Sequence, residues 1–132
     1  MSNAVDRILS ATAKKAEAPT EYRALIESGG RPQMGFSVTH ATGDMDGFLY
    51  HSLDNLNYQT RNGAEFLSFT HHAKAVTIQG TGLRVIFRAI MRHTAMELHQ
   101  QDGRPAAAGE PVITRLEVTT VGQQGPAVRL VG

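Results

Sequence analysis

The sequence predicts an α+β domain in which a six-stranded, mainly antiparallel sheet packs on one principal helix. Residues 36–79 alternate apolar and polar side chains with a period of two, which is typical of a meander of half-buried strands. Residues 82–99 repeat apolar side chains at helical spacing, and residues 112–131 alternate again as a hairpin. An amphipathic helix and a half-buried sheet each need a partner, so we expect the helix to cover one sheet face.

Composition narrows the class of protein. The chain has 132 residues, of which 41% are hydrophobic and 19% charged, enough for one domain with a buried core. It has no cysteine, which excludes disulfide scaffolds, thiolate metal sites and cysteine nucleophiles. No stretch reaches the roughly 18 apolar residues of a membrane span, and the N-terminus lacks a signal-peptide core. We therefore expect a soluble, cytoplasmic protein.

The first part of the chain predicts a short N-terminal helical arm. We assign residues 1–30 to this arm and residues 31–132 to a single α+β domain. Pro19 interrupts the arm, and Thr20 can cap a second helix that continues to about Ser28. Two glycines and a proline follow as a linker, so the arm could pack on the body or exchange between subunits.

Asn62-Gly63 is the strongest local signal in the chain. Both residues tolerate a positive φ, so the pair favours a two-residue type I′ hairpin turn. This turn sets Leu56 opposite Phe69 and Tyr58 opposite Leu67, with both pairs on one face. The opposite face then carries Asn57, Gln59 and Ser68, with Phe66 as its main apolar exception. The register therefore sorts apolar from polar side chains.

Two further turns extend this face. A loop at Gly43–Gly47 sets His40 opposite Tyr50, and a tight turn at Ala73-Lys74 leads into the next strand. The expected core face of the meander comprises Phe36, Val38, Phe48, Tyr50, Leu56, Tyr58, Leu67, Phe69, Val76 and Ile78. Agreement of four predicted strands on one buried face supports the assignment.

The principal helix is expected over residues 82–99. Gly80 or Thr81 can cap its start, and Asp102-Gly103 ends it. Its apolar stripe consists of Leu83, Ile86, Phe87, Ile90, Met91, Thr94 and Leu98. After a loop, the final hairpin begins with the alternating residues Val112, Thr114, Leu116 and Val118.

Asp54 and His71 form the candidate catalytic pair. The Asn-Gly register places them directly opposite each other on the core face, near one end of the sheet. A carboxylate beside a histidine can fix its tautomer and raise its pKa, as a general base requires. The sequence places no serine or threonine nucleophile beside them, so it predicts no triad. Their neighbours are apolar, and we expect a packed structural pair without turnover.

A candidate anion site lies where a strand meets the helix. Free backbone N–H groups at such a junction can bind phosphate, and a ridge of arginines at i, i+4 and i+8 follows on the helix. The candidate residues are Gly80, Thr81, Gly82, Arg84, Arg88 and Arg92. Val85 occupies the third glycine position of the dinucleotide fingerprint, which excludes a Rossmann site.

The six histidines raise the question of a metal site. Zinc and non-haem iron need two or three such ligands within a few ångströms of one another. The predicted registers keep the candidates apart, so we expect no bound metal and no cofactor. The histidines are His40, His51, His71, His72, His93 and His99.

The leading hypothesis is a small non-catalytic binding or assembly domain, of unknown ligand, that self-associates as a homodimer. One helix cannot cover both faces of the predicted sheet, and its second face carries Leu49, Leu53, Phe66, Ile113 and Val121. Two alternatives stay open. One is a small enzyme that uses Asp54 and His71 as acid and base. The other is a weak RNA or anion binder that uses the arginine ridge.

Overall fold

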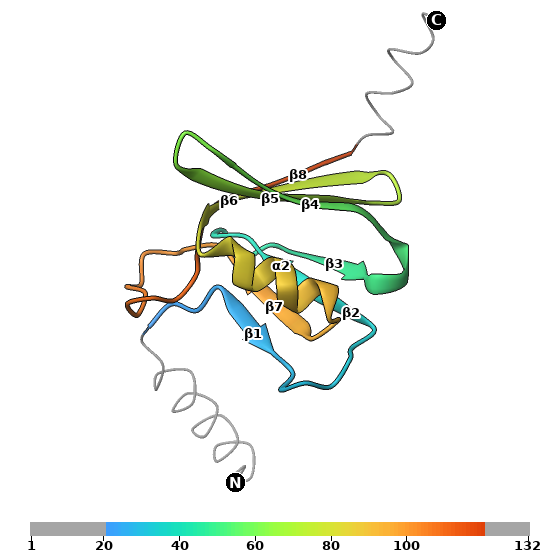
Figure 1. Ribbon diagram of the computed structural model, residues 1–132, viewed down its shortest axis with the longest axis horizontal. Helices are drawn as coiled ribbons and strands as arrows, with labels where there is room; N and C mark the ends of the chain where they lie inside the picture. Colours follow the sequence, from blue (N-terminus) through green and yellow to red (C-terminus); the bar gives the residue numbers. More distant parts are fainter. Residues whose placement is uncertain (1–20, 121–132) are drawn as a thin grey trace, which may run out of the picture.

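The computed structural model describes residues 21–120 as two facing four-stranded sheets with one α-helix that contacts both (Figure 1). The strand orders are β1-β7-β2-β3 and β4-β5-β6-β8. The elements are β1 (Leu25–Glu27), β2 (Gly35–Thr39), β3 (Met45–Leu49), a 3-10 turn (Tyr50–Ser52), β4 (Leu53–Arg61), β5 (Ala64–His71), β6 (Lys74–Thr81), α2 (Leu83–Met91), β7 (Ala95–His99) and β8 (Val112–Thr120). No helix among these residues is long and apolar enough to cross a membrane.

The α+β class and the mainly antiparallel pairing are confirmed, but the single six-stranded sheet is wrong. The meander divides at the 3-10 turn Tyr50–Ser52, after which β4 pairs with β5 and not with β3. The Tyr50 side chain is buried there, and its hydroxyl donates a hydrogen bond to the Ala95 carbonyl of β7 (2.7 Å). Sequence alternation defines which side of a strand is apolar, but it does not say whether consecutive strands share one sheet.

The predicted helix 82–99 is wrong in its second half. Helix α2 ends at Met91, and His93 adopts a left-handed φ of 63°. His93 N–H donates to the Ile90 carbonyl and Thr94 N–H to the Ala89 carbonyl, which is the Schellman arrangement that terminates helices. The following residues form β7, which pairs parallel with β2 and antiparallel with β1.

The predicted second helix of the arm is replaced by a strand. Residues Leu25–Glu27 form β1, at the edge of the first sheet. Tyr22 and Ala24 just before it are each 1% exposed and belong to the core. The first arm helix falls on residues 1–20, which lie outside the described residues.

The Asn62-Gly63 turn is confirmed, with φ values of 50° and 84° and with Arg61 opposite Ala64. Tyr58 pairs with Leu67 as expected. The pairing of Leu56 with Phe69 is wrong, because a bulge interrupts β4. Asn55 and Leu56 occupy the bulge, and Asn55 has a left-handed φ of 55°.

The other two turns form at different residues. The first loop lies between Thr39 and Met45, so His40 does not face Tyr50, and Phe36 pairs with Phe48. The second turn lies between His71 and Lys74 rather than at Ala73-Lys74. Both differences shift the register by an even number of residues, so each strand keeps its core face. Of the expected core, Leu56 and Tyr58 are half-buried and the other members are buried.

Strand β8 departs from simple alternation. A bulge sets Ile113 opposite Gly80 and Arg115 opposite Gln79, so Thr114 has no register partner. Ile113 is therefore fully buried, although the sequence predicts it on the second face. A Cβ at Gly80 would lie 1.9 Å from the Val112 carbonyl oxygen, so this close approach requires glycine. The expected return strand of this hairpin, with Val121, lies outside the described residues.

Candidate functional site

The structure does not bring the side chains of Asp54 and His71 together. The bulge in β4 makes Leu53 the register partner of His71 and Thr70 the partner of Asp54, so the two side chains leave opposite faces of the sheet. The exposed Asp54 carboxylate accepts the N–H of Asn55 (2.9 Å). The acid–base hypothesis therefore loses the contact on which it was based.

His71 instead links the two sheets. Its Nε2 accepts a hydrogen bond from the Leu49 N–H of the edge strand β3 (2.9 Å), and its ring stands edge-on to Phe48. Burial lowers the pKa of His71 below its ordinary value, and the positive charges of His72 and Lys74 act in the same direction. A histidine that accepts this hydrogen bond at Nε2 must be neutral.

The helix N-terminus in the candidate anion site already holds an anion of the chain itself. Gly82, with a φ of 67°, is the N-cap residue, and as a glycine it has no side chain that could cap the helix. Glu65 of β5 accepts the N–H groups of Gly82 and Leu83 (2.9 Å each). Burial opposes ionisation of this carboxyl, but these hydrogen bonds and one from the Tyr58 hydroxyl lower its pKa overall.

Of the other members of the anion set, Arg84 lies close to this cap, and its charge also lowers the pKa of Glu65. Arg84 lies over the Tyr58 ring, with its guanidinium carbon 5.6 Å from the ring centre. Four of these other members are exposed, namely Thr81, Arg84, Arg88 and Arg92. The ridge therefore exists, without an aromatic surface between its arginines.

The histidines are distributed over several contacts. His40 Nε2 lies 3.0 Å from an Asp46 carboxylate oxygen, and Lys74 approaches the other oxygen at 3.2 Å. His93 stacks on the Tyr50 ring at 4.3 Å. Within residues 21–120, no three histidine, aspartate or glutamate side chains are arranged to hold a metal ion.

Polar side chains from four strands lie together on a different surface. The outer faces of β4, β5, β6 and β8 carry two adjoining hollows of about 220 Å³ and 350 Å³, both lined by Phe66 and Thr77. We call this surface the Phe66 trough. It comprises Asn57, Gln59, Arg61, Phe66, Ser68, Thr77, Gln79, Arg115 and Glu117.

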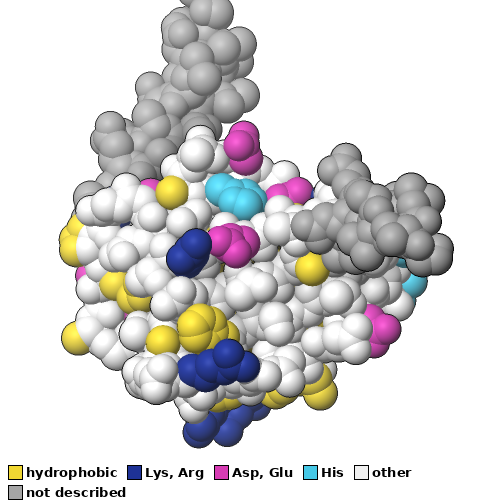
Figure 2. Space-filling model, turned by 90° about the horizontal axis from the view of Figure 1, so that it is seen from above, with side chains coloured by type: hydrophobic (Ala, Val, Ile, Leu, Met, Phe, Trp, Pro, Cys, Tyr) yellow, Lys and Arg dark blue, Asp and Glu magenta, His cyan; other side chains and the backbone are white. Residues whose placement is uncertain are grey.

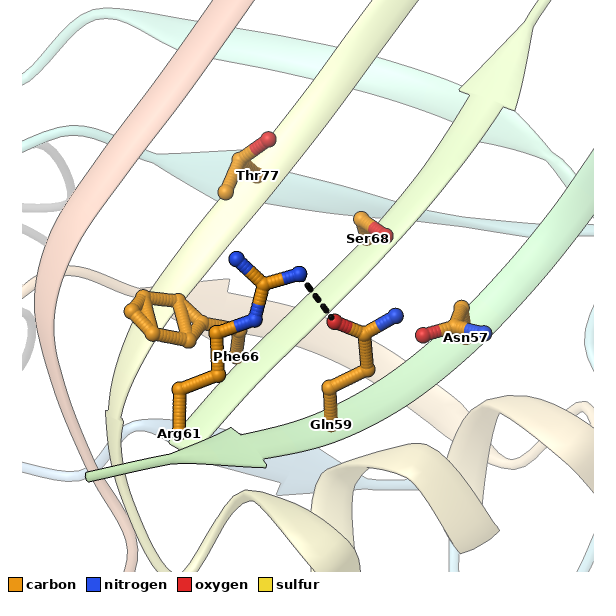
Figure 3. Close-up of a pocket in the computed structure, with 6 residues that line it drawn as sticks. All are labelled: Asn57, Gln59, Arg61, Phe66, Ser68 and Thr77. Carbon is orange, nitrogen blue, oxygen red and sulfur yellow. Dashed lines mark hydrogen bonds between the residues drawn. The ribbon is translucent and has the colours of Figure 1, made fainter. Parts of the chain in front are cut away.

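The strand register orders the trough into two rows. One row runs Asn57, Ser68, Thr77, Glu117 across the sheet, and the other runs Gln59, Phe66, Gln79, Arg115. The half-buried Phe66 ring is therefore flanked on its neighbouring strands by two glutamine amides. Figure 3 shows Arg61 beside this ring, with its Nη2 3.5 Å from the Gln59 side-chain oxygen.

The trough is polar but carries little charge. Arg115 is paired with Glu117 at 2.9 Å, and most other lining groups are amides and hydroxyls. Figure 2 looks onto this side of the molecule, where uncharged polar side chains and backbone form most of the surface. The sequence pattern already places Asn57, Gln59, Phe66 and Ser68 on one face. The sequence also predicts the strand that begins at Val112, but it does not predict that this strand pairs with β6 and completes the two rows.

Comparison with family models, with curated proteins and with solved structures finds no match to this chain.

Proposed function

We propose that this protein is a non-catalytic binding domain that holds a neutral oligosaccharide in the Phe66 trough. The observation that carries the proposal is the row in which an aromatic ring lies between two amides on a sheet face of low net charge. The C–H face of a sugar ring packs on an aromatic ring, and each sugar hydroxyl both donates and accepts hydrogen bonds. Glutamine and asparagine amides offer donors and acceptors at fixed spacing for such hydroxyls.

The dimensions of the trough agree with this ligand. Neighbouring strands lie about 4.8 Å apart, so a row across four strands spans roughly 14 Å. That length accommodates two or three linked sugar rings. The hollows are open rather than enclosed, which suits an extended chain that lies across the strands.

The charge of the trough argues against single-stranded nucleic acid as its ligand. Proteins that bind single strands combine a positively charged groove with several stacking aromatics. The Phe66 trough has one aromatic ring, and Glu117 neutralises one of its two arginines. The RNA hypothesis therefore rests on the arginine ridge of α2 alone.

The proposal is tested by titrating the ¹⁵N-labelled protein with cello-, malto- and chito-oligosaccharides of two to four units. At least one series should shift backbone amides of β4, β5, β6 and β8 around Phe66, with affinity rising from disaccharide to trisaccharide. Phe66→Ala should weaken binding at least tenfold. Thr119→Ala, on the same sheet outside the trough, should leave it unchanged.

A trough that stays unperturbed by all three series at about 20 mM would refute the proposal, because even a weak site with a millimolar Kd, about −4 kcal/mol, is then largely occupied. Shifts around Phe66 with a uridine oligonucleotide, and none with sugars, would contradict it in favour of nucleic acid.

Self-association is a second candidate function, favoured by a different surface. The residues predicted to form one apolar face are divided, since Ile113 is buried inside and Phe66 lies in the trough. Large apolar side chains are nevertheless exposed on the outer face of β3, where Met45 is 62% and Leu49 43% exposed. We propose that a second copy covers this surface in a two-fold dimer.

The cytoplasmic location of the protein also stays a prediction.

Light scattering at high micromolar concentration tests this dimer. The wild type should have twice the chain mass, and the double variant Met45→Glu/Leu49→Glu should be a monomer. Met91→Glu, on the exposed side of α2, is the matched control and should leave the dimer intact. A wild-type monomer would eliminate the self-association hypothesis and leave the binding proposal untouched.

A further inference from the structure

Another hollow, separate from the Phe66 trough, lies on the outer face of the sheet β1-β7-β2-β3. Its volume is about 190 Å³, and it is lined by Glu21, Arg23, Ile26, Glu97, His99 and Arg104. The register pairs Ile26 with Glu97, and the intervening Leu98 is fully buried, so these side chains point away from the core. All the lining residues except Ile26 are ionisable, which distinguishes this hollow from the Phe66 trough, where most lining groups are amides and hydroxyls.

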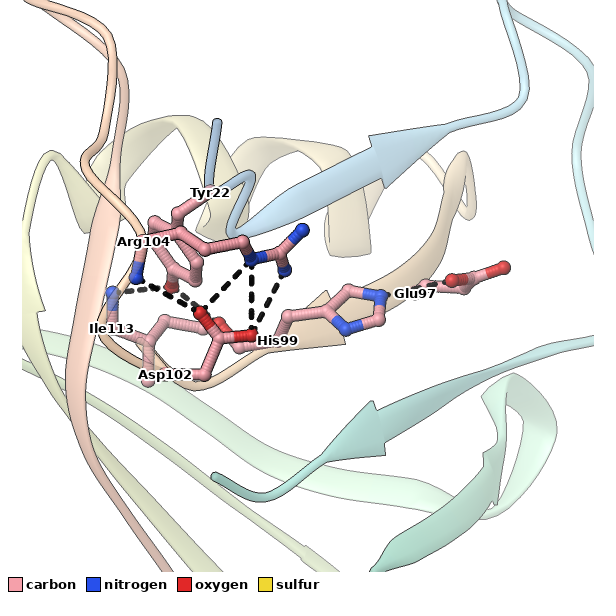
Figure 4. Close-up of polar contacts among 6 residues, drawn as sticks. All are labelled: Tyr22, Glu97, His99, Asp102, Arg104 and Ile113. Carbon is pink, nitrogen blue, oxygen red and sulfur yellow. Dashed lines mark hydrogen bonds and ion pairs between the residues drawn. The ribbon is translucent and has the colours of Figure 1, made fainter. Parts of the chain in front are cut away.

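Buried hydrogen bonds hold the wall of this charged hollow in place. Tyr22 is buried beneath it, and its hydroxyl donates to the His99 carbonyl and accepts the Ile113 N–H (Figure 4). Burial raises the pKa of Tyr22 to about 12, so this hydroxyl keeps its proton. The segment before β1, the end of β7 and the start of β8 are thereby joined at one point.

Two of the lining side chains are fixed by partners that leave part of each group free. Arg104 binds Asp102 through Nε (3.0 Å) and Nη2 (2.9 Å), and within residues 21–120 its Nη1 group has no protein partner. This arginine lowers the pKa of the Asp102 carboxyl. His99 Nε2 lies 2.9 Å from one Glu97 carboxylate oxygen, and the other oxygen has no hydrogen-bond partner within residues 21–120.

In the described part of the chain, the adjoining strand β2 carries a polar atom without a partner, although its residue is not among those that line the hollow. Thr39 of β2 is the register partner of His99, so both side chains stand on the same face of the sheet. Among the residues that the structure describes, the buried Thr39 hydroxyl has no hydrogen-bond partner. Buried polar groups are rarely left in this state in native proteins.

We propose that the charged hollow binds a small aliphatic α-amino acid as its zwitterion. The guanidinium groups of Arg23 and Arg104 suit a carboxylate, and the carboxylates of Glu21 and Glu97 suit an ammonium group. Ile26 offers an apolar contact for the side chain. The hollow holds several times the roughly 30 Å³ that one water molecule occupies, which is the size range of a small amino acid.

The mixed charge is the reason for choosing a zwitterion. A simple anion in this hollow would meet two glutamates, and a simple cation would meet two arginines. A ligand that carries both charges can pair with both kinds of side chain.

The proposal is tested with ligands that share one branched aliphatic group. L-Valine, isovalerate and isobutylamine present both charges, the carboxylate alone and the ammonium alone. In ¹⁵N-detected titrations of the full chain, valine or one of glycine, alanine and leucine should shift the amides of Ile26, Glu97, His99 and Arg104 saturably. Isovalerate and isobutylamine should bind at least tenfold more weakly than valine.

Variants separate the hollow from general charge effects. Arg23→Gln and Glu97→Gln should each weaken amino-acid binding at least tenfold, whereas Arg115→Gln, in the Phe66 trough, should not change it. Dispersed spectra of the variants will show that they are folded. The absence of saturable shifts with all four amino acids, equal binding of isovalerate, or shifts that survive Arg23→Gln would each overturn the proposal.

Discussion

At the scale of single residues, His71 shows how one backbone detail reassigns a side chain. A left-handed φ at Asn55 moves the register, so His71 faces away from Asp54 and accepts the Leu49 N–H. The Asn62-Gly63 turn was predictable because this dipeptide favours positive φ. The bulge was not, because an asparagine within an alternating strand does not by itself indicate a left-handed conformation.

The role of His71 predicts a stability that falls with acid. Its pKa is lowered in the folded state, so the unfolded chain binds the proton first as the pH decreases. The stabilisation of the folded state by neutral His71 is complete above the ordinary histidine pKa of about 6.5, and it is lost as the pH falls below that value. Urea unfolding between pH 7.5 and 5 should show this loss for the wild type.

His71→Phe should reduce that pH dependence, because it keeps an aromatic ring against Phe48 but removes the titrating acceptor. His93→Asn, at an exposed position whose left-handed φ asparagine tolerates, is the control and should retain the wild-type slope. A His71→Phe variant whose stability falls with acid as steeply as the wild type would show that His71 is not the group responsible.

At the scale of elements, the start of α2 depends on a residue from another element. The helix has no side-chain cap of its own, and Glu65 of β5 binds its first N–H groups. Glu65→Ala should lower the free energy of unfolding by about 1–2 kcal/mol, as the loss of an N-cap does. Glu117→Ala, which removes an exposed strand carboxylate, should cost less than about 1 kcal/mol.

The Glu65 contribution has its own pH signature. Its carboxyl pKa is lowered in the folded state, so the stabilisation is present above the ordinary glutamate pKa of about 4.3 and disappears as the pH falls through the folded value. Thermal unfolding at pH 7 and pH 3 measures both variants. Equal losses for Glu65→Ala and Glu117→Ala at pH 7 would contradict the capping role.

The extent of α2 shows why periodicity alone could not assign residues 95–99. Ile90, Thr94 and Leu98 continue the helical stripe, and all three are buried in the structure. Because His93 terminates the helix, Leu98 reaches the core from β7, and Thr94 reaches it from the position directly before β7. Apolar spacing therefore predicted the burial of these three residues correctly and the type of element incorrectly. It was wrong for Met91, which is 61% exposed at the end of the helix.

At the scale of the whole molecule, local patterns predicted the inner faces of the strands but not their division between two sheets. The even register shifts left Phe36, Phe48 and Phe69 in contact across the interior. The separation after Tyr50 and the insertion of β7 between β1 and β2 depend on long-range pairing. The Phe66 trough follows from the same pairing, since β8 brings Arg115 and Glu117 beside residues about forty positions earlier.

The central claim, that the Phe66 ring receives a sugar, is tested most directly by saturation-transfer NMR on the complex. With the aromatic protons of the protein irradiated, the ligand C–H protons of one sugar face should receive the strongest saturation, and Phe66→Ala should remove this pattern. Uniform saturation of the ligand, or a pattern unchanged in Phe66→Ala, would contradict the account.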